Sequence, residues 1–527
     1  MARAFDYVIV GAGSGGCALA GRLSEDPEVS VLLLEAGGRD RSPNIKIPAA
    51  FAKQFRTKLD WDYASGPEPA LGGRELYVPR GKSLGGSSSM NAMMCTRGRP
   101  VDFDAWRDAG CEGWGWDDVM PYFLRMENNS RGESEIHRTG GPVDIIDQVD
   151  PRPLTRRFLD AAVESGIPAN PDVNAPEQDG VTQTQVFQRN GRRWSAADAY
   201  LRPAMKRPNL TVKTKVQALR LDLEGNRVRG VCIRDSRGRE GVARAERDVI
   251  LTAGAIGSPQ LLMLSGIGDP GELREAGVEA RVDLPGVGSN LQDHPFLTLC
   301  FESQVSDDLA DAEKPAALLQ WLFRRRGPLT SNVGEGMAYI RTRAGLAAPD
   351  IELIFAPAYY HDHGFDERDG HAFTLGPVLL SPKARGAIRL RSADPDDKPH
   401  ILGNHLSEPE DLAAMTVGVR KAREIAGTAP LADVAGAEIV PGGGVEGDAE
   451  IEDFIRREVE LLYHPAGTCR MGAADDGDAV VDPQLRVRGV KGLRVADASV
   501  MPLIPGGHIH LPVMMIGERA ADLIRGG

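Results

Sequence analysis

Three histidines near the C-terminus have the residue type and the setting to act as acid–base groups. His464 lies in the glycine-bounded segment YHPAGTCRMG, and His508 and His510 form the H-x-H pair of GGHIHLP. Imidazole has an ordinary pKa of about 6.5, so it is mostly neutral near pH 7 and can accept a proton. A base of this kind beside an electron acceptor can take the hydroxyl proton of an alcohol while a hydride leaves the carbon. The histidines therefore favour oxidation chemistry, provided that an electron acceptor binds nearby.

Two other roles fit the same residue type. A histidine in a loop beside a proline can be a buried structural residue, and an H-x-H pair can bind a metal. His361 and His363, near His371, raise the same question of metal binding. No cysteine or carboxylate lies at a matching spacing, and zinc would need further ligands. We therefore expect no metal.

The N-terminal stretch FDYVIVGAGSGGCALAGRLSEDPEVSVLLLE, residues 5–35, supplies a site for an electron acceptor. It has the pattern of a buried strand, a glycine turn, a helix and a second strand. Gly11, Gly13 and Gly16 form a G-x-G-x-x-G turn, whose backbone N–H groups can approach a pyrophosphate at the positive end of the helix. Glu35 ends the second strand, where an acid accepts the ribose hydroxyls of a dinucleotide. The combination favours a dinucleotide site over a tight turn without a ligand.

Three further segments have the character of ligand-binding loops. The run GKSLGGSSSMNAMM, residues 81–94, lets the backbone pass a flat ligand at Gly85 and Gly86, and it is too short to be a tether. A buried strand at 248–252 leads into AGAIGSPQLLMLSGIG, where we expect Ser258-Pro259 to start a helix. A strand within 492–497 ends in Asp497, at the edge where open parallel sheets bind ligands.

The remaining segments indicate how these loops are held. Tryptophans within 102–126 suggest packed helices, and the pieces at 210–214, 218–223 and 228–235 resemble a meander. Beyond about residue 300, strand-like pieces and a helix at 409–426 predict an antiparallel sheet with helices on one side. The expected class is α/β with a second domain.

Composition limits the partners and the compartment. The chain has 527 residues, 42% hydrophobic content and a formal charge of -13, which argues against nucleic acid and against an anionic membrane. Six cysteines without a C-x-x-C pair or disulfide-like spacing indicate a reducing compartment. The first strand leaves no room for a signal peptide, and no apolar run is long enough to span a bilayer. We expect a cytoplasmic protein without a membrane partner.

The motifs together resemble the glucose–methanol–choline (GMC) oxidoreductases, FAD-dependent enzymes that mostly oxidise alcohols. The resemblance runs from about Tyr7 to Ile524, and its most specific pieces are GKSLGGSSSMN and GAIGSPQLLMLSGIG. It implies a Rossmann-like FAD-binding domain formed by 1–150, 205–298 and 462–527. It also implies a substrate domain, formed by 151–204 and 299–461, on a mostly antiparallel sheet flanked by helices.

The resemblance also implies residue roles. His464 matches the family's catalytic histidine, and His510 matches a second catalytic position that is His or Asn among relatives. Within the FAD site, Val216 would contact the adenine region through its backbone. The implied cofactor-binding residues are Gly11, Gly13, Ser14, Gly16, Glu35, Gly85, Gly86, Ser87, Asn91, Val216, Asp497 and His508.

Two departures from the family pattern matter. Some members attach FAD covalently through a histidine directly before the signature asparagine, but Met90 stands there, so we expect non-covalent FAD. Cys95 stands where an aromatic residue is usual, which bears on packing near the flavin. The substrate candidates Phe355, Tyr359, Tyr360 and Tyr463 either line a pocket or belong to an ordinary buried strand and its surroundings.

Three classes of function follow from the sequence. The leading one is oxidation of a small-molecule alcohol to a carbonyl, with oxygen or another electron acceptor. A hydroxynitrile-lyase-like enzyme that uses FAD only structurally is the alternative on the same scaffold. A nucleotide-binding protein without catalysis is disfavoured by the paired histidines. No cage for a quaternary ammonium is apparent, and the sequence leaves the alcohol, the acceptor and the oligomeric state open.

Overall fold

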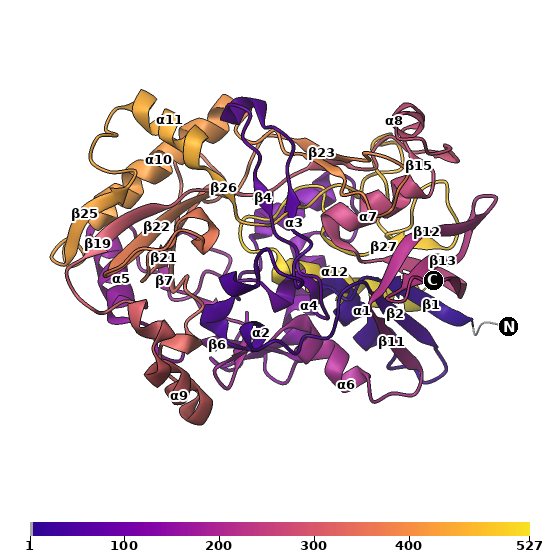
Figure 1. Cartoon of the computed structure of the whole chain (residues 1–527), viewed down its shortest axis with the longest axis horizontal. Helices are drawn as coiled ribbons and strands as arrows, with labels where there is room; N and C mark the ends of the chain where they lie inside the picture. The colour runs from indigo at the N-terminus through magenta and orange to yellow at the C-terminus, as the bar shows by residue number, and fades with distance from the viewer. Residues whose placement is uncertain (1–3, 527) are drawn as a thin grey trace.

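The N-terminal stretch forms the centre of a parallel sheet. The structure is a computed structural model, and it describes residues 4–526 (Figure 1). Strand β1 (Phe5–Val10) pairs in parallel with β2 (Val31–Glu35) and β14 (Glu240–Leu251), and α1 (Ser14–Leu23) joins β1 to β2. Val8 and Ile9 are fully buried, as a strand covered on both faces requires. The predicted strand, turn, helix and strand are confirmed.

The rest of this seven-stranded sheet comes from distant segments. β11 (Leu210–Thr214) extends it beyond β2, and β27 (Leu493–Val495) pairs with β14, both in parallel. β12 (Val216–Glu224) and β13 (Arg227–Asp235) complete it as an antiparallel meander with β14. The C-terminal segment therefore lies beside the N-terminal one, and α12 (His510–Arg525) packs against α1.

A second, eight-stranded sheet carries the other half of the molecule, and the pairs within it are antiparallel. Helices α5 (Pro153–Glu164) and α10 (Pro409–Ala426) pack on one face of it, as predicted for a sheet with helices on one side. Its strands are β7 (Gly180–Gln183), β18 (Pro295–Phe296), β19 (Leu299–Ser303), β20 (Gly336–Ile340), β21 (Ile351–Ala356), β22 (Ala372–Leu379), β25 (Ala435–Val440) and β26 (Glu460–Leu461).

Smaller sheets and helices fill the space around these two. Two three-stranded sheets are formed by β17 (Ser289–Leu291), β23 (Gly386–Arg389) and β24 (His400–Leu402), and by β5 (Glu127–Asn129), β6 (Val143–Asp147) and β8 (Gln185–Val186). The two-stranded pairs are β3 (Tyr63–Ala64) with β4 (Tyr77–Val78), β9 (Gln188–Arg189) with β10 (Arg192–Arg193), and β15 (Ile267–Gly268) with β16 (Val282–Asp283). The remaining α-helices are α2 (Pro43–Lys46), α3 (Pro100–Asp108), α4 (Trp116–Met126), α6 (Arg202–Ala204), α7 (Gly254–Leu264), α8 (Pro270–Glu275), α9 (Pro315–Arg324) and α11 (Asp448–Glu458).

The predicted tryptophan-rich helices are α3 and α4. Trp106 and Trp114 are fully buried, and Phe103 meets Trp106 edge to face with ring centroids 5.0 Å apart. Their role is packing, as the sequence indicated.

The predicted start of α7 at Ser258-Pro259 is wrong. The helix begins at Gly254, so Pro259 lies inside it and provides no N–H for the carbonyl of Ala255, one turn earlier. The hydroxyl of Thr468 donates to that carbonyl at 2.6 Å, which satisfies the group that proline leaves open. A partner that is distant in sequence thus makes an internal proline acceptable.

Sheet membership broadly follows the segments expected for two domains. Residues 5–35, 210–251 and 493–495 build the parallel sheet, and most strands between 299 and 461 build the antiparallel one. β18, at 295–296, belongs to the antiparallel sheet, and β23 and β24 form a separate sheet with β17, in which β23 is the middle strand. The domain boundaries themselves stay a prediction. Within the described residues, α-helices that are long and apolar enough to cross a bilayer are absent.

Candidate active site

A cavity of about 490 Å³ lies between the two large sheets. The glycine turns after β1 and before Asn91 line one end, and residues of β21 and β22 line the other. His464, His508 and His510 all reach it. The predicted loops therefore converge on one space.

The nucleotide-binding end is shaped by positions where a side chain does not fit. Gly11 has a φ of +107°, and a methyl group there would lie 2.5 Å from the Thr252 carbonyl oxygen. At Gly86, a methyl group would lie 2.8 Å from the Cα atom of Gly13, so the two glycine-rich loops touch. At Gly13 itself, the nearest atom to such a methyl group is 3.9 Å away, which leaves room on the cavity side. This cradle fits a ligand that the backbone contacts directly, without intervening side chains.

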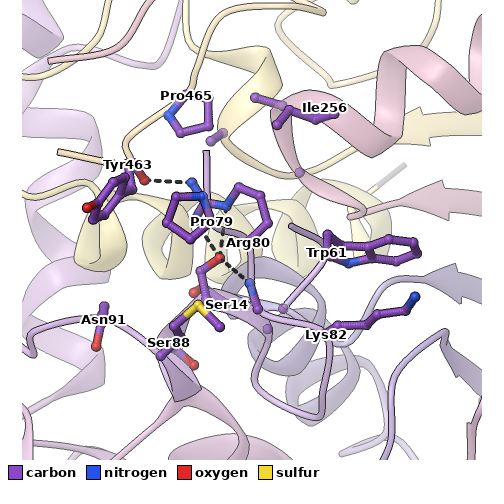
Figure 2. Close-up of a pocket in the computed structure, with 18 of the residues that line it drawn as sticks. Ser14, Trp61, Pro79, Arg80, Lys82, Ser88, Asn91, Ile256, Tyr463 and Pro465 are labelled. Carbon is purple, nitrogen blue, oxygen red and sulfur yellow. Dashed lines mark hydrogen bonds between the residues drawn. The ribbon is translucent and has the colours of Figure 1, made fainter. Parts of the chain in front are cut away.

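Glu35 lies at the end of β2, where the sequence predicted an acid for ribose. Its carboxylate accepts hydrogen bonds from the backbone N–H groups of Ala12 at 2.9 Å and Gly37 at 2.7 Å. Burial raises the pKa of Glu35 to about 7, and these bonds and the charge of Lys82 oppose the rise. Lys82 lies 4.0 Å from the ring centroid of Trp61 (Figure 2).

The middle of the cavity is held by the half-buried Arg80 and the buried Arg193. Arg80 donates to the backbone carbonyl of Tyr463 at 2.6 Å and to the hydroxyl of Ser87 at 3.0 Å (Figure 2). Arg193 donates to the side-chain oxygen of Asn91 at 2.6 Å. These bonds fix the serine-rich loop against the segment that carries His464.

Asp497 also reaches the cavity, but its carboxylate is occupied by the protein. It accepts bonds from the Gly254 backbone at 2.8 Å, the Ser258 hydroxyl at 2.6 Å and the Ser499 hydroxyl at 2.6 Å. Asp497 thereby holds the N-terminus of α7 at the cavity wall, where backbone N–H groups favour negative charge.

His464 is half-buried and lies among polar groups from a third segment. Its Nδ1 atom is 3.0 Å from Nδ1 of His294, and its backbone N–H donates to Asp293 at 2.7 Å. Burial, followed by the nearby charges of His294, His508 and Arg80, lowers the pKa of His464 well below 6.5. The ring is therefore neutral near pH 7 and keeps one nitrogen free to accept a proton.

His508 is the cavity histidine that contacts His464. The two rings meet edge to face with centroids 5.2 Å apart. Nε2 of His508 is 3.1 Å from a carboxylate oxygen of Glu352, a fully buried residue of β21. The other oxygen of Glu352 has no hydrogen-bond partner among the described residues, although the side chain of Tyr339 also lies close to this carboxylate.

His510 has a different environment, which corrects the predicted pairing of His464 with His510. Its Nδ1 atom is 2.9 Å from the hydroxyl of Ser14, in the first glycine turn, and its ring packs on Phe187. The reason is the start of the helix: α12 begins at His510, so His510 belongs to the first helical turn, whereas His508 lies in the loop before it. His508 and His510 therefore face different neighbours.

The predicted substrate residues divide into two groups. Tyr360 and Tyr463 line the cavity, but Phe355 and Tyr359 do not. Phe355 stacks on Phe158 of α5, because side chains alternate along β21 and its neighbours Ile354 and Ala356 face the cavity. Tyr359 instead donates its hydroxyl to Asp366 at 2.6 Å.

The predicted cofactor residues are mostly brought together. Gly16 and Gly85 lie behind the lining and shape the turns, and the fully buried Cys95 is not part of the cavity wall. The cofactor residues that do line it are Gly11, Gly13, Ser14, Glu35, Gly86, Ser87, Asn91, Val216, Asp497 and His508.

Sequence reasoning missed the residues that support the histidines. His294 lies in the polar loop GVGSNLQDHP, which has no distinctive pattern. Glu352 carried a usable signal, because a lone acid within the otherwise apolar strand ELIFA requires a buried partner.

One side-chain cluster within 4–526 has a geometry that could hold a metal ion. Ligand atoms of Asp362, His363 and Glu460 lie within 4.8 Å of one another. However, Nδ1 of His363 is also 2.6 Å from the hydroxyl of Tyr463, which gives the histidine a structural role beside the cavity. The expectation of no metal stays a prediction.

Comparison with known proteins agrees with this geometry. Two family models described as GMC oxidoreductase match residues 5–296 and 382–517. An uncharacterized GMC-type oxidoreductase of Mycobacterium tuberculosis is 49% identical, covering 99% of both chains. An oxygen-dependent choline dehydrogenase of Brucella anthropi is 43% identical, covering 99% of this chain and 95% of its own. The crystal structure of a pyridoxine 4-oxidase from Mesorbium loti superposes with a TM-score of 0.90 at 36% identity, covering 99% of both chains.

The fold and the site define a flavin-binding oxidoreductase. The chain belongs to the GMC oxidoreductase family, and its cofactor is FAD. The residues present fit this group, because the two touching glycine loops and the buried Glu35 form a cradle for a dinucleotide.

Proposed function

We propose that the protein oxidises an alcohol to a carbonyl, with His464 as the base and His508 as its partner. The observation that carries the proposal is the neutral His464 in ring contact with His508, in the same cavity as the dinucleotide cradle. When bound, FAD supplies the hydride acceptor. The electron acceptor that follows is oxygen or another molecule.

His294 sets which nitrogen of His464 is free. The two Nδ1 atoms are 3.0 Å apart, so one ring donates and the other accepts. Burial lowers the pKa of His294 to about 3, while the backbone of Leu380 favours a proton on this ring. Among the described residues, Nε2 of His294 has no hydrogen-bond partner. A proton on this nitrogen leaves Nδ1 of His294 unprotonated, so Nδ1 can accept a hydrogen bond from the Nδ1–H group of His464. Nε2 of His464 is then the atom that takes the alcohol proton.

His508 performs the complementary task. The carboxylate of Glu352, 3.1 Å from Nε2, orients the ring of His508. The neighbouring His508 also helps to lower the pKa of His464, which keeps His464 neutral. Held in this way against the ring of His464, His508 is placed to hydrogen-bond the substrate oxygen while neutral His464 accepts its proton.

The lining of the antiparallel end favours a neutral, apolar or aromatic alcohol. Its side chains are predominantly apolar and aromatic, and the carboxylates that line the cavity are Glu35, Asp396, Asp397 and Asp497. Glu35 and Asp497 bind backbone or serine groups of the cradle, and Asp396 contacts Arg234 and Gln217 beside Val216. The carboxylates near His464, Asp293 and Glu352, do not line the cavity, so a quaternary ammonium would lack an acidic partner in this part of the lining, and choline is not the favoured substrate. The apolar residues of this end are Phe51, Phe55, Met90, Phe296, Val333, Ile354 and Ala356.

Non-covalent attachment of FAD follows from Met90, which lines the cavity directly before Asn91. Its thioether offers no nucleophilic nitrogen. Acid precipitation should release the flavin into the supernatant. Yellow colour that stays in the pellet would mean a covalent bond.

The function is tested by mixing the FAD-loaded protein anaerobically with primary aliphatic, aromatic, sugar and amino alcohols. Flavin bleaching by an apolar or aromatic alcohol is the expected result. Oxygen is then admitted and peroxide measured, which separates an oxidase from a dehydrogenase. A flavin that no alcohol reduces, together with cleavage of a cyanohydrin, would instead support the lyase alternative.

A further inference from the structure

Helix α9 is the most exposed apolar element among the described residues. Four of the ten large apolar side chains that are exposed there lie on this one helix: Leu318, Leu319, Leu322 and Phe323. Leu319 is 55% and Phe323 82% exposed. Figure 1 shows α9 projecting at the periphery, on the side of the molecule away from the N-terminus.

The four side chains form one continuous surface, which we call the apolar face of α9. Because consecutive helical residues are about 100° apart, positions i, i+1, i+4 and i+5 share one side. Ala317 and Trp321, the buried residues of the helix, lie on roughly the opposite side. Trp321 packs with Ile47 and Ala50 and donates its indole N–H to the Gly191 carbonyl at 2.7 Å. The inner side thus anchors the helix, and the apolar face is left outward.

Two arginines that form no ion pair with any described residue lie at the base of the helix. The guanidinium carbons of Arg325 and Arg192 are 4.4 Å and 5.6 Å from the ring centroid of Trp321. Burial and the nearby positive charge of Arg192 lower the pKa of Arg325. Nη1 of Arg325 is buried without a hydrogen-bond partner. That buried nitrogen is closed to a ligand, but Arg192 is exposed and Arg325 is half-buried, and two neighbouring guanidinium groups that reach the surface are suited to a phosphate.

The surrounding carboxylates do not neutralise these arginines, because they already have partners. The nearby ion pairs are Asp150 with Arg326, Asp311 with Lys314 and Glu313 with Lys53. Arg324, on the helix itself, is exposed and forms no ion pair within 4–526. The chain as a whole carries -13, so the positive charge at α9 is local.

We propose that α9 docks the protein onto a bilayer surface that contains anionic phospholipid. The apolar face enters the interfacial region, and Arg192 and Arg325 bind lipid phosphate. An apolar face bordered by arginines is the pattern of helices that lie in the membrane plane. The proposal revises the expectation of no membrane partner, which rested on the net charge and on the lack of an apolar run long enough to span a bilayer. Trp321 of α9 packs against Ala50, and the next residue, Phe51, lines the cavity. The docked helix therefore lies beside a segment of the cavity wall.

The test is flotation of the FAD-loaded full chain with vesicles of equimolar phosphatidylcholine and phosphatidylglycerol. We expect binding at low salt, and a marked loss at high salt or with pure phosphatidylcholine. The variant Leu319→Ser/Phe323→Ser should lower the partition coefficient about tenfold or more. Arg192→Gln and Arg325→Gln should each lower it about fivefold.

A matched control is Val163→Ser/Met205→Ser, which removes two exposed apolar side chains elsewhere. It should bind vesicles like the wild type, and flavin absorbance verifies that every variant is folded. Absence of binding at low salt, or equal binding by all variants, would overturn the proposal. A wild-type dimer in light scattering that Leu319→Ser/Phe323→Ser dissociates, without vesicle binding, would show that a second copy covers this face.

Discussion

The two ends of the cavity are built in different ways. The nucleotide end is made by backbone within short stretches, with Gly11, Gly13 and Glu35 all inside the first thirty-five residues. The substrate end is made by side chains from four distant segments, which contribute His294, Glu352, His464 and His508. The nucleotide end depends on the backbone conformations that its glycines allow. The substrate end depends on which side chains the fold brings into contact.

The largest expected effect breaks the substrate end alone. His464→Ala removes the neutral imidazole that takes the alcohol proton, so anaerobic flavin reduction should slow by about 10²- to 10⁴-fold. FAD should stay bound, because the cradle is made elsewhere. Stopped-flow bleaching measures the rate, and the flavin-to-protein absorbance ratio measures occupancy. A reduction rate like that of the wild type would refute His464 as the base.

The next effect concerns the nucleotide end. Glu35→Ala removes a buried acceptor and leaves the N–H groups of Ala12 and Gly37 unpaired, so FAD binding should weaken by roughly 1.5–3 kcal/mol. Once FAD is supplied in excess, the rate of flavin reduction should return to the wild-type value. Fluorescence titration of the apoprotein with FAD gives the affinity. Unchanged affinity would show that Glu35 supports only the turn or has no role in binding.

A smaller effect is expected at the positioning residue His294. His294→Leu removes the acceptor for His464 Nδ1, a hydrogen bond worth up to about tenfold in rate. The pH profile of flavin reduction should also change, because His464 can then adopt either tautomer. His294→Gln restores an acceptor and should recover part of the rate. Equal rates in both variants, with an unchanged pH profile, would reduce His294 to a packing residue.

The smallest effect is expected from a change of pH, which should leave the rate of flavin reduction unchanged. Burial holds the pKa of His464 well below 6.5, so its neutral form persists as the pH falls through that value. Protonation, which would remove the accepting lone pair, begins only at lower pH. Flavin reduction should therefore stay constant between about pH 8 and pH 6. A decline centred near pH 6.5 would indicate a solvent-exposed histidine with an ordinary pKa.

The same contrast explains what the sequence could predict. The turn at Gly11 and the helix at 409–426 depend on local pattern, and the structure confirms them. The predicted start of α7 failed because Thr468, more than two hundred residues away, supplies the bond that Pro259 leaves open. A sequence alone does not show which distant residues come into contact through tertiary packing.

The candidate site shows the same limit. His464, His508 and His510 were all recognised as cavity residues, but which two meet depends on where α12 begins and how its first residue turns. The sequence left two interpretations open for Phe355, because the alternation along β21 has two possible registers relative to the cavity, and the structure shows a buried strand residue that stacks on Phe158. His294 had no sequence signal, since its role exists only through His464.

The most direct test compares His508→Ala with His510→Ala under anaerobic conditions, at saturating FAD. His508 contacts His464 and Glu352, whereas His510 contacts Ser14 of the nucleotide turn. We predict that His508→Ala slows flavin reduction by about 10²-fold with FAD affinity retained. His510→Ala should mainly weaken FAD binding and reduce the flavin at nearly the wild-type rate once saturated. The reverse pattern, with the large rate loss in His510→Ala, would contradict the His464–His508 pair.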